Sequence, residues 1–239
     1  MQYINVSDTE RAKGLELEKI EVEVQTIIQS FNAPEEENGR PAVEKQLEIS
    51  QKYWNGFAED YQELNKKITI HSARELHRHM DLQNAQSVLE VGAGGGIGTQ
   101  DLLTYLHSDT SLTVTDFSSA MIEQVHTRLA SNLGSGVKIT IEEANTLDLS
   151  QIGTSSKDRY VSNLCLPLVP EPDTMFQEAR RVLKPGGIAG FTIWGQEENS
   201  GQFTIFKLAT EEVNMAQGMA PHSEDAPLQS DLVKLRERI

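Results

Sequence analysis

The stretch of residues 87–99 most constrains the fold of this chain, because a short apolar run leads directly into a glycine-rich loop. The run 88–91 is typical of a buried strand. A ligand can approach backbone without Cβ atoms closely, and the loop offers such backbone at Gly92, Gly94, Gly95, Gly96 and Gly98. We expect a helix over 97–106, with free N-terminal N–H groups facing the loop. The sequence therefore predicts a strand, loop and helix that cradle a polar ligand.

The spacing of the glycines argues against the dinucleotide fingerprint G-x-G-x-x-G. Counted from Gly92, the third glycine position falls on Ile97, and counted from Gly94 it falls on Thr99. The pattern that does fit is E-x-G-x-G-x-G, which runs from Glu90 to Gly96. An NAD-binding loop is therefore disfavoured.

A second segment, 112–121, reads as a strand that ends in Asp116. Its separation from the glycine loop is about that at which nucleotide-binding α/β folds place a ribose-binding acid, and a carboxylate there can accept two ribose hydroxyls. The alternative is that Asp116 only caps a helix beginning near Ser118, a role for which Ser118 or Ser119 would serve as well.

A third segment, 137–147, alternates like a strand and then turns acidic at Glu142 and Glu143, followed by Ala144. Glu142 and Glu143 can also be read simply as a solvated strand end. A fourth segment gives a strand ending near Asn163, a helix over 174–183, a Lys-Pro-Gly-Gly turn and a strand over 188–194.

The alternation of strands and helices over 87–194 predicts an α/β fold, a parallel sheet with helices on both faces. Ligand sites in such sheets lie outside the carboxyl ends of the strands. We therefore expect convergence at one crevice of the side chains that end the four strands: Glu90, Asp116, Glu143 and Asn163.

The four segments, in this order and spacing, resemble class I S-adenosylmethionine (SAM) dependent methyltransferases of the small-molecule, type 11/25-like group. The string Arg181-Val-Leu-Lys-Pro-Gly-Gly187 is the most family-specific of them. The resemblance implies a Rossmann-like doubly wound parallel sheet in the order 3-2-1-4-5, SAM as cofactor and methyl transfer to a small-molecule acceptor. The cofactor-binding residues it implies are Glu90, Gly92, Ala93, Gly94, Gly96, Asp116, Phe117, Met121, Glu143, Ala144 and Asn163.

Upstream, the segment 53–61 resembles the aromatic entry segment of small-molecule methyltransferases, which folds over the cofactor. The resemblance implies that Tyr53, Trp54 and Tyr61 form the acceptor pocket or a lid that excludes water. At helical spacing Tyr53, Phe57 and Tyr61 would also share one stripe, so packing of an N-terminal helix is the alternative.

We assign no catalytic base, because positioning alone can supply about 7 to 11 kcal/mol of the barrier to methyl transfer. His71, His77 and His79 lie on an expected helix, where a surface role explains them adequately. His77 and His79 are two positions apart and point to different helix faces, so we expect no metal site there. Cys165, the only cysteine, reads as a small core residue.

Composition narrows the classes of partner. Lysine and arginine number 21 against 36 aspartates and glutamates, a formal net charge of −15, which disfavours nucleic acid and anionic membrane surfaces. No apolar run approaches the roughly 20 residues of a membrane span. A single cysteine and the early acids Asp8 and Glu10 favour a cytoplasmic protein.

The two ends of the chain complete the expected organisation. We divide it into an N-terminal extension, 1–50, and a methyltransferase-like domain, 51–239. In the extension, a seam of apolar residues over 17–31 favours a helix, although 15–24 also alternates like a strand, and a polar linker over 32–41 follows.

Relatives of this group continue, after a helix like that expected over 231–239, into two more strands. We therefore expect a sheet without these strands, with strand five as an open edge that residues 202–217, residues 15–24, a protein partner or a second subunit covers. The alternative to an enzyme is a catalytically weak or inactive methyltransferase-like subunit that serves as a structural or interaction protein.

Overall fold

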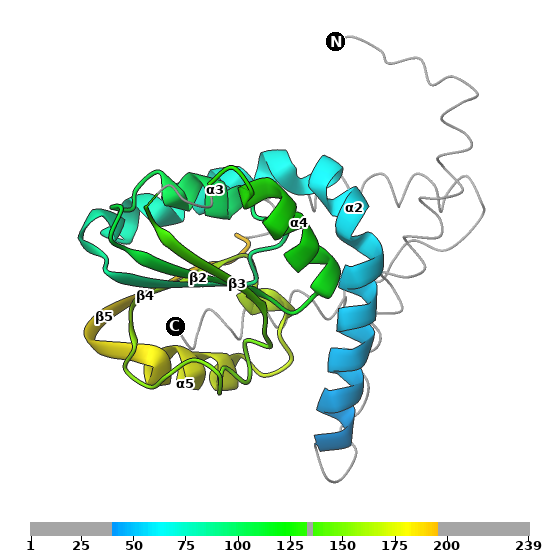
Figure 1. Ribbon diagram of the computed structural model, residues 1–239. Coiled ribbons are helices and arrows are strands. Elements are labelled where there is room, and N and C mark those ends of the chain that lie inside the picture. Colours follow the sequence, from blue (N-terminus) through cyan, green and yellow to red (C-terminus); the bar gives the residue numbers. More distant parts are fainter. Residues whose placement is uncertain (1–39, 133–135, 196–239) are drawn as a thin grey trace, which may run out of the picture. The chain divides into compact units, whose positions relative to one another are not determined.

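The computed structural model describes residues 40–132 and 136–195 (Figure 1). Contacts between Cα atoms divide the chain into two units, residues 1–53 and 54–239. Helix α2 (Arg40–His79) begins in the first unit, and the fold below is that of the described part of the second. The seam and the linker over 15–39 and the segments 202–217 and 231–239 lie outside the described residues, whereas residues 40 and 41, expected in the linker, begin helix α2.

Five strands form one parallel sheet in the order β3-β2-β1-β4-β5, which confirms the predicted topology. Strand β1 is central and buried along its whole length, as the apolar run predicted. Because all strands run in the same direction, their carboxyl ends share one edge of the sheet. The strands are β1 (Ser87–Val91), β2 (Ser111–Asp116), β3 (Lys138–Glu143), β4 (Lys157–Asn163) and β5 (Leu183–Thr192).

Helices cover both faces of the sheet. Helices α3 (Ile97–Leu103) and α4 (Ser119–Leu129) lie on one face and α5 (Pro172–Val182) on the other (Figure 1). Two short 3-10 helices, η1 (Leu82–Asn84) and η2 (Leu166–Leu168), precede β1 and α5. The three-layer arrangement expected from the alternation of strands and helices is therefore present.

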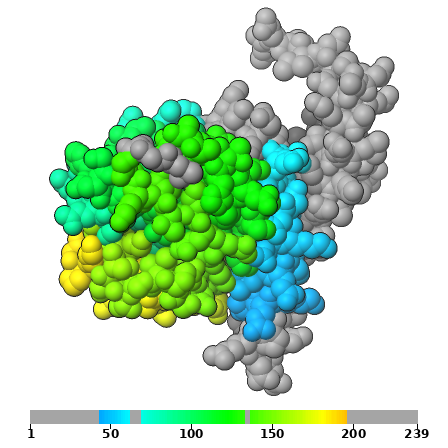
Figure 2. All heavy atoms as spheres, viewed as in Figure 1, coloured from blue at the N-terminus to red at the C-terminus, as the bar shows by residue number. Residues whose placement is uncertain are grey.

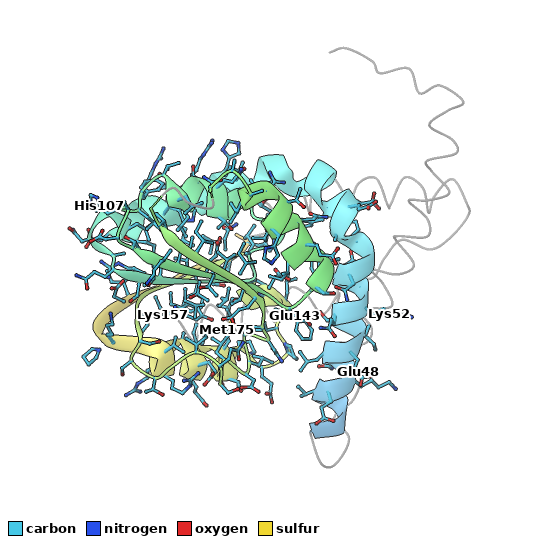
Figure 3. The ribbon with its side chains drawn as sticks, viewed as in Figure 1. Glu48, Lys52, His107, Glu143, Lys157 and Met175 are labelled. Carbon is cyan, nitrogen blue, oxygen red and sulfur yellow. The ribbon has the colours of Figure 1, made fainter. Side chains whose placement is uncertain are left out.

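Two apolar clusters, one on each face, hold these layers together, as burial of strand side chains on both faces requires. The cluster on the α4 face includes Leu76, Met80, Val88, Leu102, Val114, Val125 and Val161. The cluster on the α5 face includes Leu89, Val91, Tyr160, Met175, Ala179 and Val182, with Met175 labelled in Figure 3. Figure 2 shows the outer surface of these layers in the view of Figure 1.

The Lys-Pro-Gly-Gly segment differs from the prediction. We expected a turn over 184–187 between helix and strand, but Leu183 already pairs with Lys157, and Ile188 pairs with Arg159. Residues 184–187 therefore bulge out of the edge strand, where Gly186 has a φ of 80°. Proline and glycine fit there because a bulge tolerates a missing N–H donor and a left-handed residue.

Helix α3 is shorter than the predicted 97–106, because its last turn tightens. The N–H groups of Thr104 and Tyr105 bond three residues back, to Asp101 and Leu102, and the Thr104 hydroxyl also donates to the Asp101 carbonyl. Local bonds of this kind commonly end an α-helix.

Within the described residues, β5 is an edge strand, and Ile188 on it is 36% exposed. A groove of about 560 Å³ lies between this strand and α5, lined by Phe176, Arg180, Leu183, Phe191 and neighbouring residues. The segments expected to cover the edge lie outside the described residues, so that expectation stays a prediction. None of the described helices combines the length and apolar character that crossing a membrane requires.

Candidate functional site

Glu90 lies on the central strand, one residue before its end, and is only 3% exposed. Its Oε2 atom has no hydrogen-bond partner among the described residues. Burial raises the pKa of this carboxyl from its usual 4.5 to about 7. Since an unpartnered buried carboxylate costs free energy, Glu90 is a group that a cationic or hydrogen-bonding ligand would stabilise.

The glycine loop follows Glu90 and adopts a backbone that side chains would prevent. Gly92, Gly94 and Gly96 have φ values of 63°, 54° and 79°. A Cβ atom on Gly92 would lie 2.6 Å from the Cys165 Sγ atom, and one on Gly94 would lie 3.3 Å from the Tyr61 ring. Glycine is therefore required at position 92 both by the backbone conformation and by the space available.

Hydrogen bonds fix the loop from two sides. The Ala93 N–H donates to the Thr115 carbonyl at 3.0 Å, which ties the loop to β2. On the other side, Arg128 of α4 donates from Nε to the Gly95 carbonyl at 2.5 Å. Sequence spacing gave no signal for Arg128, because its contact lies 33 residues away along the chain.

Asp116 ends β2 beside this loop. Its Oδ2 atom accepts from the Gly94 N–H at 2.8 Å and its Oδ1 atom from the Ser118 N–H at 2.9 Å. Burial is the largest cause that raises its pKa, and the nearby charge of Glu143 adds to it. The cap of α4 is Ser118, whose hydroxyl accepts from the Met121 N–H at 3.2 Å. Asp116 is therefore not the helix cap that the alternative interpretation allowed.

The predicted third-strand residues lie next to Asp116. Glu143 pairs with Asp116 in the sheet register and is exposed, and the Ala144 N–H donates to the Asp116 carbonyl at 2.9 Å. Glu143 lies at the carboxyl edge, and Lys157 at the opposite end of the sheet (Figure 3). The structure thus brings the ends of β1, β2 and β3 together, as the topology predicted.

Three other residues predicted to bind the cofactor differ in their surroundings. Asn163 lies at the same edge, but its Nδ2 donates to the Thr69 carbonyl at 3.1 Å and its Oδ1 accepts from the Thr192 hydroxyl at 2.7 Å. Met121 is 2% exposed on the inner side of α4, whereas Phe117 is half-buried directly after Asp116. Cofactor contacts by these three residues stay predictions.

An aromatic cluster lies next to the glycine loop, with Tyr61 close to Gly94. The ring centroid of Trp54 lies 5.6 Å from that of Tyr61 and 6.2 Å from that of Phe57. Burial, and then the charge of Asp116, raises the pKa of Tyr61 to about 12. The cluster joins Phe57 of the predicted stripe to Trp54 and Tyr61, two of the three residues expected to form a pocket or lid, and the third, Tyr53, belongs to the other unit of the chain.

Asn55, within this aromatic segment, is a residue that the sequence analysis missed. Its Oδ1 accepts from the Ser118 hydroxyl at 2.7 Å, so it joins the segment to the start of α4. No motif or periodicity pointed to Asn55, because the two residues lie 63 positions apart along the chain.

The surroundings of His77, His79 and Cys165 are those of structural residues rather than of catalytic ones. His77 is 1% exposed and bonds through Nδ1 to Asp101 at 2.9 Å, whereas His79 is exposed beside Glu75. The two therefore point to different faces of α2, as predicted. Burial raises the pKa of the Cys165 thiol to about 12, so it is protonated at neutral pH. Among the described residues no group of three or more acids, histidines or cysteines is placed to hold a metal ion.

The sheet order and the acidic, glycine-lined strand edge define a Rossmann-like fold of the kind that methyltransferases have. A Methanococcus maripaludis protein proposed to be an S-adenosyl-L-methionine-dependent methyltransferase has this fold, with a TM-score of 0.52 and 21% identity over 77% of this chain and 84% of its own. Residues 88–187 match the family model described as a methyltransferase domain. This part of the chain therefore resembles a methyltransferase domain, as its motifs predicted.

Curated relatives match over part of their length. A 2-methyl-6-phytyl-1,4-hydroquinone methyltransferase of Oryza sativa subsp. japonica is 32% identical over 115 residues, which are 48% of this chain and 31% of the rice protein. A malonyl-[acyl-carrier protein] O-methyltransferase of Paenibacillus is 25% identical over 72% of this chain and 62% of its own. The chain thus spans less than two thirds of the length of either relative.

Proposed function

We propose that this protein binds SAM at the carboxyl edge of the sheet and transfers its methyl group to a small-molecule acceptor. The observation that carries the proposal is the convergence of three features: the Glu90 carboxyl with its unpartnered Oε2 atom, the glycine loop and Asp116. When bound, SAM supplies a methyl carbon that an oxygen, nitrogen, sulfur or carbon nucleophile can attack.

The residues at this edge fit such a cofactor. A carboxylate offers about four acceptor sites, and Asp116 accepts from the N–H groups of Gly94, Phe117 and Ser118, which leaves capacity for a ribose hydroxyl. Glu90 offers an unpartnered buried oxygen to a positively charged ligand. The left-handed glycines let a ligand approach the backbone where a Cβ atom would stand.

The side chains of this protein contribute positioning and water exclusion to the reaction. The aromatic cluster of Trp54, Phe57 and Tyr61 is suited to shielding the site from water. Cys165 and Tyr61, with pKa values of about 12, stay protonated at neutral pH and do not act as ready bases. Holding the acceptor in near-attack geometry is therefore the main task of the chain.

A small-molecule acceptor is supported by the relatives and by charge. The name of the rice protein specifies a hydroquinone and that of the Paenibacillus protein an acyl-carrier-bound malonyl group. The net charge of −15 opposes nucleic-acid acceptors. We also infer that a protein partner or a second copy of the chain covers the β5 edge, since an open edge promotes aggregation.

Calorimetric titration of the full chain with SAM, with its demethylated product S-adenosylhomocysteine and with ATP tests the proposal. We expect one SAM and one S-adenosylhomocysteine bound per chain, and ATP to bind far more weakly, because the acidic edge repels phosphates. A folded protein that binds neither SAM nor its product would refute cofactor binding and favour the structural-subunit alternative.

The acceptor class has its own test. We would incubate the protein with radiolabelled SAM and, in separate reactions, with hydroquinones, malonyl thioesters, RNA or DNA, and count the label in each isolated product. Transfer to one panel would identify the class, whereas transfer only to RNA or DNA would contradict a small-molecule acceptor.

A further inference from the structure

We propose that Asn55 is a positioning residue that fastens the aromatic cluster, Trp54, Phe57 and Tyr61, to the strand edge where Asp116 lies. Its relevance to methyl transfer rests on the proposed function. The fastening itself rests on contacts among residues of α2, β2 and α4.

Asn55 completes the N-terminal cap of α4. The Asn55 Oδ1 atom accepts from the Ser118 hydroxyl at 2.7 Å, from the Ala120 N–H at 3.3 Å and from the Ser119 hydroxyl at 3.4 Å. The Ser118 hydroxyl in turn accepts from the Met121 N–H. Two N–H groups that have no partner within α4 are thus satisfied, one by Ser118 and one by a residue 65 positions away.

The hydrogen bond between Asn55 and Ser118 completes a closed chain of contacts at the carboxyl edge of the sheet, where we propose that the cofactor binds. The Gly94 N–H donates to Asp116, and Asp116 accepts from the Ser118 N–H. Ser118, which is fully buried, donates to Asn55. This chain of contacts closes through the aromatic cluster, because Tyr61 packs edge-on against Trp54 and lies against Gly94.

Through these contacts, the carboxyl edge of the sheet, where we propose that the cofactor binds, is connected to the aromatic cluster. A ligand that binds Asp116 acts on the same carboxylate that orients Ser118, and Ser118 carries the contact to Asn55. Loss of the Asn55 carbonyl would leave the Ala120 N–H without its partner and remove this attachment of the aromatic segment to α4. Asn55 therefore holds the proposed acceptor side and the cofactor side in one arrangement.

Trp54 is a natural reporter, because the chain has only two tryptophans, Trp54 and Trp194. In a Trp194→Phe background, acrylamide quenching of Trp54 fluorescence measures how tightly the cluster is held. We expect Asn55→Ala to raise the quenching constant at least twofold without ligand. It should also weaken SAM binding about 5- to 20-fold, the effect of losing one or two hydrogen bonds.

Two further variants separate positioning from general destabilisation. Asn55→Asp keeps a side-chain acceptor for the start of α4 and should restore most of the Trp54 protection. Asn84→Ala, the matched control, removes a bond from an exposed amide to Asp81, before β1, and should change neither measurement. At saturating S-adenosylhomocysteine, Trp54 should become better protected in the parent protein but not in Asn55→Ala.

Should Asn55→Ala fail to fold, Ser118→Ala removes the donor with the shortest bond to Asn55 and should raise quenching in the same direction. A folded Asn55→Ala protein whose Trp54 is quenched like that of Asn84→Ala overturns the proposal. The ligand-free comparison decides this even if the parent protein binds no SAM, a result that would refute only the proposed function.

Discussion

The two ends of the parallel sheet differ in the counter-charge that the protein gives their acids. At the amino end, the Asp158 Oδ2 atom accepts from the N–H groups of Gln86 and Ser87 at 3.0 Å, and the Lys184 ammonium lies 3.7 Å away. At the carboxyl end, neither Glu90 nor Asp116 forms an ion pair with a lysine or arginine of the described part of the chain.

The difference indicates what each end does. Asp158 accepts hydrogen bonds from the start of a neighbouring strand and lies near a lysine, so the protein itself supplies the counter-charge of this acid. Buried acids left without a cation cost stability, which a protein recovers when a ligand binds them. The carboxyl end is thus arranged for a ligand and the amino end for stability.

Glu90 should give the largest effect on stability. Its folded pKa of about 7 exceeds its usual 4.5, so the folded state holds the proton more tightly than the unfolded chain. Stability is therefore fully present below pH 4.5 and is lost as the pH rises through 7. We expect Glu90→Gln to be more stable than the parent at pH 8 by up to about 3 kcal/mol, with little difference at pH 4.5, measured by urea unfolding.

The same Glu90→Gln variant should bind SAM more weakly than the parent, because the amide carries no negative charge. A stability gain of equal size at pH 4.5 and pH 8 would contradict the ionisation argument. Glu178→Gln is the opposite control, because Arg181 lowers the pKa of Glu178 and this change should cost stability at pH 8.

Asp116→Ala should weaken SAM binding by roughly 1 to 3 kcal/mol, the range for leaving buried polar partners unsatisfied. Calorimetric titration measures the effect directly. Unchanged SAM affinity in a folded variant would remove Asp116 from the proposed site.

Asp158→Asn tests the acid at the amino end of the sheet. It should lower the free energy of unfolding by about 1 to 2 kcal/mol, because charge-assisted bonds to the start of β1 become neutral ones. SAM affinity should stay within twofold of the parent in the same titration. A large loss of affinity would break the separation of the two ends.

His77 should give the smallest effect. Burial lowers its pKa below the usual 6.5, so the folded protein keeps the ring neutral and protonation favours unfolding. Stability is present above pH 6.5 and falls below it, by at most about 1.4 kcal/mol per pH unit. Urea unfolding at pH 7 and pH 5.5 measures this slope, which should diminish in His77→Gln; an unchanged slope would assign the proton uptake elsewhere.

Much of the fold was predictable because its signals are local. Buried parallel strands appear as short apolar runs, and glycines with left-handed backbone appear as a spaced loop, so the parallel sheet and the meeting of Glu90 with Asp116 followed from the sequence, whereas the strand order came from the resemblance to a known family. The bulge over 184–187 was not predictable, because the same residues suit a turn between helix and strand equally well.

The site was predictable only where topology alone places a residue. Asp116 and Glu143 end neighbouring strands, and the register brings them together. Asn163 also ends a strand, but its amide is engaged by Thr69 and Thr192, which lie far away in the sequence. Whether Asp116 or Ser118 caps α4 was likewise open until the backbone conformation was known.

The sequence by itself determined the parallel sheet and the glycine loop beside an acidic strand end, since each depends on periodicity and residue type over a few positions, whereas the strand order followed from the resemblance to a known family. Only the tertiary structure decided that Asn55 caps α4 and that Arg128 holds the loop. These contacts depend on how distant segments pack against one another, and local patterns carry no record of that packing.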